Sequence, residues 1–380
     1  MRILHTSDWH LGRLFHQLSL LDDQRYCVDQ VLQYIEQYKP DVVVIAGDIY
    51  DRSVPPSAAV ALFNEFVNQC LTNYKVPIIA ISGNHDGAER LGFAANQLKQ
   101  SGLHLITSFE QMLEPVILED QHGPVYFWGV PFHDPAQVAQ FTQQTVKDYN
   151  QAHQALLTHL SHQQTARNVL ISHCYLDGAS ESESERPLSI GGADRVDWQL
   201  FKDFNYTALG HLHQPQYKGQ TNIRYSGSLM KYSFSEQHHK KALTKVDINK
   251  DGEVKTEQLA LIPKHDVRVL TGSLTELIER AEHDNARNDY LQVVLTDKEA
   301  LLNPMARLRQ VYPNVLELRK QRFQAQVGDT IAAAREQLKR SDLDVFADFF
   351  NQVQEQPISE QQRQHLAALI EDIAKQERNE

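Results

Sequence analysis

Seven polar side chains, each placed where an apolar run of the sequence ends, have the types that bind divalent metal ions. They are Asp8, His10, Asp48, Asn84, His173, His211 and His213. None is a thiolate, and a mixture of carboxylate, amide and imidazole ligands favours manganese or iron in octahedral or near-octahedral sites over structural zinc. Two such ions, roughly 3.5–4 Å apart, can activate a water molecule and clamp a phosphate group.

These ligands divide naturally between two ions. We predict that Asp8, His10 and His213 hold one ion, that Asn84, His173 and His211 hold the other, and that Asp48 bridges them. Each motif alone is a weak signal, because a single Asp after a strand more often caps the next helix. A polar ligand type placed after an apolar run at five strand ends is a specific signal. The alternative, that all of these residues only make structural hydrogen bonds, explains the pattern poorly. The site needs neutral imidazoles and ionised carboxylates, so activity should fall in acid.

Three further residues beside these ligands are predicted to act without binding metal. His85 follows Asn84 directly, and we predict that it stabilises charge on a phosphate or protonates the leaving oxygen. Asp86 is placed to orient the His85 ring, and Asp51 is predicted to accept the second N–H of a metal-bound imidazole. The alternative for His85, an eighth ligand or a residue that starts a helix, stays open.

Short apolar strands must deliver these side chains. Residues 42–51 read VVVIAGDIYD, and a β-branched run without alternation is typical of a strand buried on both faces. Gly47 permits a sharp turn, so Asp48 follows the strand's carboxyl end, where open α/β sheets bind ligands. Comparable runs occur at residues 1–8, 77–82, 168–173 and 206–213. Because they alternate with helical patterns, the sequence predicts an α/β sandwich with its strands buried between helices.

Composition and charge narrow the class of protein. The chain has 380 residues, 41% of them hydrophobic and 23% charged, which suits an ordinary soluble protein with more than one domain. We expect no signal peptide and no membrane-spanning helix, since no apolar run approaches ~18 residues. Three widely separated cysteines favour a reducing cytoplasm over a disulfide framework. The sequence contains no GxxxxGK[ST] phosphate-binding loop, so any ATP that the protein's function uses must be bound elsewhere.

Two polar stretches differ from the rest of the chain. The net charge of the whole chain is −12, but residues 200–250 contain eight Lys and Arg residues against three acids, a local charge of +5. The negative net charge argues against a protein surface that is basic overall and binds nucleic acid everywhere. The positive charge of residues 200–250 allows a local basic groove. Residues 177–186 read DGASESESER, an acidic low-complexity segment that we predict to be a mobile, solvated loop.

The chain is predicted to contain four parts. Residues 1–262 form the main domain, residues 263–320 read β-α-β-α-β and form a small α/β unit, and residues 321–341 form a polar linker. Residues 342–380 are predicted to form two amphipathic helices, the second opened by a capping box at Ser359 and Gln362. Their apolar stripes are Phe346, Phe349, Phe350 and Val353, then Leu366, Leu369, Ile370 and Ile373.

The series of motifs resembles the calcineurin-like metallophosphoesterase superfamily. The matching motifs are Asp-x-His, Gly-Asp-x-x-Asp, Gly-Asn-His-Asp, a lone later His and Gly-His-x-His. HTSDWHLG at residues 5–12, GNHDGAERL at 83–91 and RYSGSLMKYSFSE at 224–236 are similar to the bacterial nucleases of the DNA break-repair family. The resemblance covers the whole chain and is weakest at residues 110–165 and 177–200. It implies a β-sandwich flanked by helices, a DNA-contacting capping domain at 263–320 and a terminal helix pair.

The resemblance also implies an activity and partners. It implies a manganese-dependent exonuclease and endonuclease for DNA ends and hairpins in repair, recombination and replication, driven by an SMC-like ATPase that the terminal helices bind. It further implies a homodimer formed through helices at residues 57–73 and 89–100. We predict DNA contacts from the basic stretch, at Lys218, Arg224, Lys231, Lys240 and Lys241. Two alternatives stay open: a phosphoesterase for small substrates on the same core, and a scaffold with a decayed site.

Overall fold

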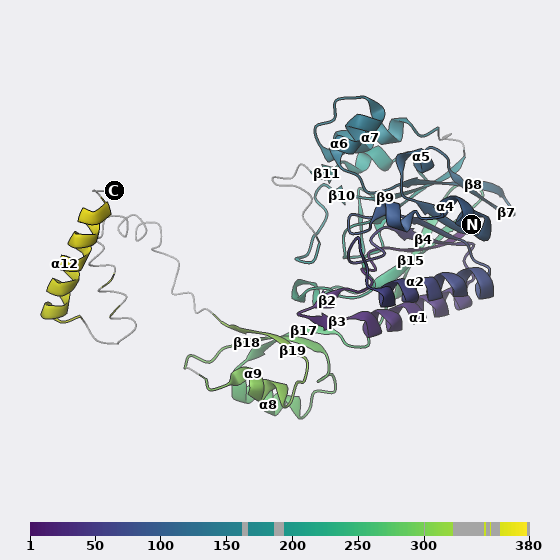
Figure 1. The fold of residues 1–380 in the computed structure, drawn as a ribbon. Coiled ribbons are helices and arrows are strands. Elements are labelled where there is room, and N and C mark those ends of the chain that lie inside the picture. The colour runs from purple at the N-terminus through teal and green to yellow at the C-terminus, as the bar shows by residue number, and fades with distance from the viewer. Residues whose placement is uncertain are drawn as a thin grey trace. The chain divides into compact units, whose positions relative to one another are not determined.

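The protein was analysed as a computed structural model, which describes residues 1–161, 166–185, 194–299, 301–321, 346, 350 and 358–377 (Figure 1). The chain divides into two compact units, Met1–Lys320 and Gln321–Glu380. None of the helices in the described ranges is long and apolar enough to cross a membrane.

The first unit is built around two six-stranded sheets. One has the order β16 (Val254–Ala260), β15 (Ala242–Ile248), β1 (Arg2–Thr6), β4 (Val42–Ala46), β5 (Ile78–Ile81), β6 (Leu103–Ile106). The other has the order β13 (Gln216–Lys218), β14 (Gln220–Tyr225), β12 (Tyr206–Gly210), β9 (Arg167–His173), β8 (Gly123–Val130), β7 (Val116–Asp120). The central strands of both sheets are parallel, and the antiparallel pairs lie at the edges. Consequently the carboxyl ends of β1, β4 and β5, and those of β9 and β12, gather at one edge of their sheet.

Apolar residues fill the space between the two sheets and the space under the helices. Val44, Ile79, Val169 and Ala208 belong to one buried cluster, which joins the inner faces of the two sheets. Helices α1 (Leu21–Tyr38) and α2 (Ser57–Asn68) cover the first sheet, while α6 (Pro135–Thr142) and α7 (Tyr149–Thr158) cover the second (Figure 1). The predicted α/β sandwich, with strands buried between helices, is therefore confirmed.

The single helix predicted at residues 89–100 is wrong. Three short pieces replace it: α3 (Ala88–Leu91), α4 (Ala95–Leu98) and η2 (Lys99–Ser101). The chain breaks at Ala94, whose φ of 58° is left-handed and incompatible with a continuing helix. Gly92 lies in the same break, where an added Cβ would come within 2.3 Å of Thr107 Oγ1. By contrast, the helix predicted at 57–73 is present as α2 continued by η1 (Gln69–Tyr74).

Residues 263–320 form the β-α-β-α-β unit that the sequence predicts. Its elements are β17 (Val267–Gly272), α8 (Leu274–Ala281), β18 (Tyr290–Leu295), α9 (Pro304–Arg309) and β19 (Val315–Lys320). The three strands are parallel and carry a small core of their own. This capping unit is also tied to the sandwich, because Asp23 in α1 accepts hydrogen bonds from Tyr290 Oη and His265 Nδ1, both at 2.8 Å. It therefore belongs to the same compact unit, and the division of the chain falls after Lys320.

Shorter elements complete the first unit: β2 (Leu14–Phe15), β3 (Leu18–Ser19), α5 (Phe109–Met112), β10 (Tyr175–Leu176), β11 (Arg195–Val196), η3 (Trp198–Phe201) and η4 (Phe234–Glu236). The second unit contains α12 (Glu360–Glu377). Ser359 and Gln362 bond reciprocally just before α12, so the predicted capping box is confirmed. Phe349 and Val353 of the first predicted stripe, and the predicted linker at 321–341 beyond residue 321, lie outside the described residues.

Candidate metal centre

The ends of five strands bring all seven predicted ligands to one place. Six of the seven side chains are buried, and Asn84 is partly buried. Four of them have a left-handed backbone: Asp8 (φ 53°), His10 (φ 45°), Asp48 (φ 53°) and His211 (φ 104°). Such conformations are uncommon for residues other than glycine, and they cluster at functional sites where the surrounding structure holds them.

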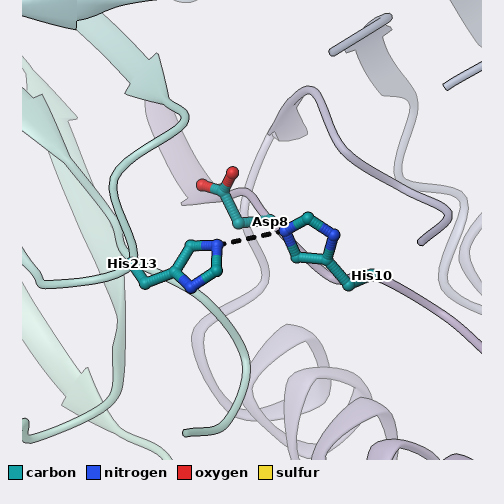
Figure 2. Close-up of side chains that lie close together, drawn as sticks. All are labelled: Asp8, His10 and His213. Atoms are coloured by element: carbon teal, nitrogen blue, oxygen red, sulfur yellow. Dashed lines mark hydrogen bonds between the residues drawn. The ribbon is translucent and has the colours of Figure 1, made fainter. Parts of the chain in front are cut away.

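The first predicted group of ligands comes together as the sequence predicts. Figure 2 shows Asp8, His10 and His213 close together, with the Nε2 atoms of the two histidines 3.1 Å apart. A ligand atom of each of the three lies within 4.8 Å of the others. Asp8 and His10 follow β1, whereas His213 follows β12, so the group joins one sheet to the other.

The second predicted group lies beside the first. Asn84 Oδ1 is 2.9 Å from His173 Nε2 and 3.1 Å from His211 Nδ1. Asp48 Oδ2 is 3.5 Å from His173 Nε2 and 3.7 Å from His10 Nε2, so this carboxylate faces a member of each group. That position is the one a bridging ligand requires.

Close approach of the backbone makes this arrangement possible. A Cβ on Gly210 would lie 1.9 Å from Ala46 O, and a Cβ on Gly83 would lie 2.2 Å from Asp48 Oδ1. Contacts that short do not occur, so any side chain at either position would push the strand ends apart. The glycines of the Gly-Asn-His-Asp and Gly-His-x-His motifs therefore serve the packing of β4 against β12 and of the two ligand turns.

Burial and mutual charge set the protonation of the ligands. Burial lowers the pKa of His211 to about 3 and that of His10 well below its usual value, so both imidazoles are neutral. Burial raises the pKa of Asp8 to about 6. Burial opposes ionisation of Asp48 as well, but the neighbouring His173 holds its pKa well below the usual value, and Asp48 in turn raises the pKa of His173 to about 9.

These residues fit two divalent cations. A buried Asp48 carboxylate needs positive charge nearby besides the backbone N–H of His85, and a metal ion would supply that charge in place of a protonated His173. The donor set of carboxylate, amide oxygen and neutral imidazole is that of a hard or borderline ion. The atoms that would bind an ion, including Asn84 Oδ1 and His10 Nε2, face other predicted ligands.

His213 is held by residues that the motifs do not include. Its Nδ1 lies 2.7 Å from Ser184 Oγ and 3.3 Å from Glu236 Oε1, and its backbone N–H donates to Glu185 Oε1 at 2.8 Å. The expectation of a mobile, solvated loop at 177–186 is therefore wrong for Ser184 and Glu185, which contact a predicted metal ligand. Arg13 adds a hydrogen bond to Ser184 O at 3.2 Å. An acidic repeat carries no local signal for such packing, so sequence reasoning missed it.

His10 is held by another unpredicted residue, Gln24 in α1. Its amide Nε2 donates to His10 O at 2.7 Å and to Trp9 O at 3.1 Å, and its Oε1 accepts from Gly12 N at 2.9 Å. Gln24 is fully buried, so all these partners are shielded from water. It thereby satisfies the backbone of the left-handed turn that carries His10.

The environment of His85 differs in part from the prediction. Its backbone N–H donates to Asp48 Oδ1 at 2.8 Å, and its ring Nδ1 lies 2.8 Å from the carbonyl oxygen of Asp51, which accepts the hydrogen bond. The predicted role of Asp86 in orienting this ring is wrong, because the Asp86 carboxylate accepts from the backbone N–H groups of Ile49, Tyr50 and Gly83. The Asp51 carboxylate lies 3.8 Å from His10 Nδ1, beyond hydrogen-bond distance.

The five predicted DNA contacts do not form one basic surface. Lys241 is 5% exposed and bonds to Glu236, and Lys231 is 8% exposed and pairs with Asp266 at 2.9 Å. The predicted DNA contacts at Lys231 and Lys241 are therefore wrong, because a buried, paired ammonium cannot reach a phosphate. Lys218 donates to Gly178 O at 2.8 Å, Arg224 lies over the Tyr217 ring, and Lys240 is exposed.

Sequence comparison places these features in a family. The profile of the calcineurin-like phosphoesterases matches residues 1–215, and that of the type 5 capsule protein repressor C-terminal domain matches residues 263–354. The SbcD subunit of the nuclease SbcCD from Staphylococcus epidermidis is 33% identical over 380 residues, which cover 99% of this chain and all of that protein. The first profile covers every predicted ligand and His85.

Two solved structures are similar at low sequence identity. A dimetal phosphatase from Danio rerio is 11% identical with a TM-score of 0.41, over 69% of this chain and 96% of that one. The protein TT1561 of Thermus thermophilus is 14% identical with a TM-score of 0.38, over 68% of this chain and 98% of that one. At these TM-scores the two structures add nothing to the assignment.

Proposed function

We propose that this chain, which belongs to the calcineurin-like phosphoesterase family and to the family of SbcD nucleases, is a two-metal DNA phosphodiesterase with exonuclease and endonuclease activity. The observation that carries the proposal is the full-length similarity to a nuclease subunit together with the complete ligand set at the strand ends. A decayed scaffold would have no reason to keep six buried and one partly buried ligand, since buried polar groups cost stability without metal.

The chemistry divides between the ions and the chain. Two divalent ions, manganese being our choice, would activate water and neutralise the charge of a bound phosphate. Asp8, His10 and His213 would hold one, Asn84, His173 and His211 the other, and Asp48 would bridge them. The His85 ring Nδ1 donates to Asp51 O, so Nε2 is the ring atom left for the reaction. In the imidazolium form that Nε2 would carry a proton, with which it would stabilise charge on the phosphate or protonate the leaving oxygen. His85 also lies close enough to His10 and Asp51 to be a further ligand, and we propose the catalytic role for it.

A pair of substrates tests this function against a phosphoesterase for small molecules. The full chain, loaded with manganese, should degrade linear DNA and nick hairpins far faster than it hydrolyses bis-p-nitrophenyl phosphate at equal concentration of ester. A chelator should abolish both activities. Hydrolysis of the small ester with no action on DNA would replace our proposal with the small-substrate alternative.

We further propose that DNA phosphates are bound by Lys218, Arg224 and Lys240, the three predicted cations that are not buried in ion pairs. Replacing Lys218 and Lys240 by alanine should flatten the salt dependence of DNA binding by nearly one unit of slope per lost contact. An unchanged slope would place the DNA groove elsewhere, such as the capping unit.

A homodimer is proposed through α2 and the short helices that follow β5. A cavity of about 700 Å³ lies between α2 and this segment, and Phe93 beside it is 80% exposed. An exposed phenylalanine next to an apolar hollow suits a self-association surface. Phe93→Ser should produce a monomer in sedimentation, whereas Leu302→Ser, at an equally exposed position in the capping unit, should leave the dimer intact. A dimer in the Phe93 variant would contradict this surface.

The partner is proposed to be an SbcC-type, SMC-like ATPase, bound by residues 342–380 and completing a heterotetramer. We also place the protein in the cytoplasm, since Cys27, Cys70 and Cys174 are buried free thiols. Deleting residues 342–380 should leave a folded, manganese-dependent nuclease on single-stranded DNA that no longer co-purifies with the ATPase. Co-purification of the shortened chain would contradict the assignment of the helix pair.

A further inference from the structure

The two ring nitrogens of His213 lie in different surroundings. Nε2 faces the metal centre, 3.1 Å from His10 Nε2. Nδ1 faces away from it, 2.7 Å from Ser184 Oγ and 3.3 Å from Glu236 Oε1. A neutral imidazole carries its proton on only one nitrogen, and a metal can bind only the other. The partners of Nδ1 therefore decide whether Nε2 can act as a ligand.

Glu236 is an ionised carboxylate inside the protein. It is fully buried, and the Lys241 ammonium donates to its Oε2 and also to His213 O at 2.7 Å and Ser228 Oγ at 2.9 Å. An ionised carboxylate can only accept hydrogen bonds. Its contacts on the Oε1 side must therefore be with atoms that bring a proton.

The hydroxyl of Ser184 connects this carboxylate to the ring. Ser184 Oγ makes a very close contact with Glu236 Oε1 and a normal one with His213 Nδ1. A hydroxyl has one proton, and the acceptor-only carboxylate requires it. Ser184 must then accept from His213, which places a proton on Nδ1 and leaves the lone pair of Nε2 free.

We propose that Ser184 and Glu236 are positioning residues that hold His213 in the Nδ1-protonated tautomer and aim its Nε2 at the first metal position. The proposal rests on the metal role of His213 in the proposed function. The backbone is fixed as well, because Glu185 accepts from His213 N and Lys241 donates to His213 O. The acidic segment and the buried ion pair thus act together on one ligand, as partners beyond the ligand shell do in other metal sites.

The tautomer can be measured without metal or DNA. In the full-length, metal-free chain labelled with ¹⁵N-histidine, the His213 signals are identified by their loss in His213→Gln. We expect a protonated Nδ1 and an unprotonated Nε2 in the unaltered protein and in Ser184→Thr, which keeps the hydroxyl. Ser184→Ala and Glu236→Gln should shift His213 toward a mixture of tautomers.

Manganese titration of the same proteins gives the second measurement. The two disruptive variants should lose about 10–100-fold in affinity for one of the two ions. Ser180→Ala and Glu183→Gln, at exposed positions of the same segment, should match the unaltered protein. Thermal unfolding of each variant distinguishes a direct loss of manganese affinity from misfolding. Ser184→Ala is the milder of the two disruptive variants, because it removes only one hydroxyl.

Two results would overturn the proposal: an unprotonated Nδ1 in the unaltered chain, or Ser184→Ala with unchanged tautomer and unchanged manganese affinity. Failure of the proposed function looks different. An unaltered chain with the Nδ1-protonated tautomer that binds no manganese would refute the metal role of the site, and with it the purpose assigned to Ser184 and Glu236.

Discussion

The two halves of the metal centre are held in different ways. Around His173 and His211 each supporting contact involves a backbone group at a strand end and joins the two sheets: His173 Nδ1 lies 2.8 Å from Ala46 O, and the His211 N–H donates to Asp8 Oδ1 at 3.0 Å. Around His10 and His213 the support comes mostly from side chains that are not predicted ligands, including Gln24 and Glu236. The same ligand chemistry is thus supported once by the backbone of packed strand ends and once by separate side chains.

This difference predicts how each half responds to substitution. Backbone contacts cannot relax independently, since strand ends packed at glycines move together, so damage to that half should be all-or-none. Side-chain contacts can be removed one at a time, so damage to the other half should be graded. Four variants, taken from the largest expected effect to the smallest, test this contrast.

Gly210→Ala should have the largest effect. The new Cβ would lie 1.9 Å from Ala46 O and 2.8 Å from His173 Nδ1, which forces β12 away from β4. We expect loss of both metal ions and a drop of about 1–3 kcal/mol in the free energy of unfolding, measured by urea denaturation. Gly272→Ala is the matched control, because its nearest neighbours are side-chain atoms at 3.3 Å or more. Normal metal content in Gly210→Ala would show that this half can relax.

Asp48→Ala removes the side chain that faces both halves. Its Oδ2 lies 3.5 Å from His173 Nε2 and 3.7 Å from His10 Nε2. We expect metal analysis to find fewer than one manganese ion per chain, with the fold retained, because one carboxylate would hold both ions. Two tightly bound ions in this variant would refute the bridge and make the halves independent.

His85→Ala should separate catalysis from metal binding. The ring bonds to Asp51 O and packs edge-to-face on His10, and in our proposal it is not a metal ligand. We expect both ions to remain and kcat to fall by about 10²–10⁴-fold, the usual contribution of a general acid. Near-normal turnover would remove His85 from the reaction, whereas loss of the ions would make it a ligand.

Gln24→Leu should give the smallest and most graded effect. This substitution removes the hydrogen bonds to His10 O and from Gly12 N and puts an apolar side chain of similar size in the same place. We expect manganese affinity to fall by roughly 10-fold at one site only, as it does when other residues that hydrogen-bond to a metal ligand are replaced. Gln33→Leu, at an exposed position of α1, serves as the control for stability. Loss of both ions in Gln24→Leu would contradict the graded response of this half.

Much of the centre was predictable because its signals are local. An unbroken apolar strand followed by a glycine and an oxygen or imidazole donor identifies a strand end, whatever the rest of the chain does. For that reason the α/β sandwich, the β-α-β-α-β unit and the seven predicted ligands, which the structure brings together, could be predicted from the sequence. The helix predicted at 89–100 failed because periodicity does not reveal the left-handed break at Ala94.

By itself, then, the sequence determined which residues can bind metal and which strands deliver them, since both depend on neighbours in the chain. Only the tertiary structure decided which charged residues face the centre. Lys240 and Lys241 are identical and adjacent, yet one is exposed and the other is buried against Glu236. Ser184 and Glu185 likewise owe their contacts with His213 to the fold, since no local pattern in the acidic segment predicts them. Burial of a charge depends on its partner, and the fold alone brings the partners together.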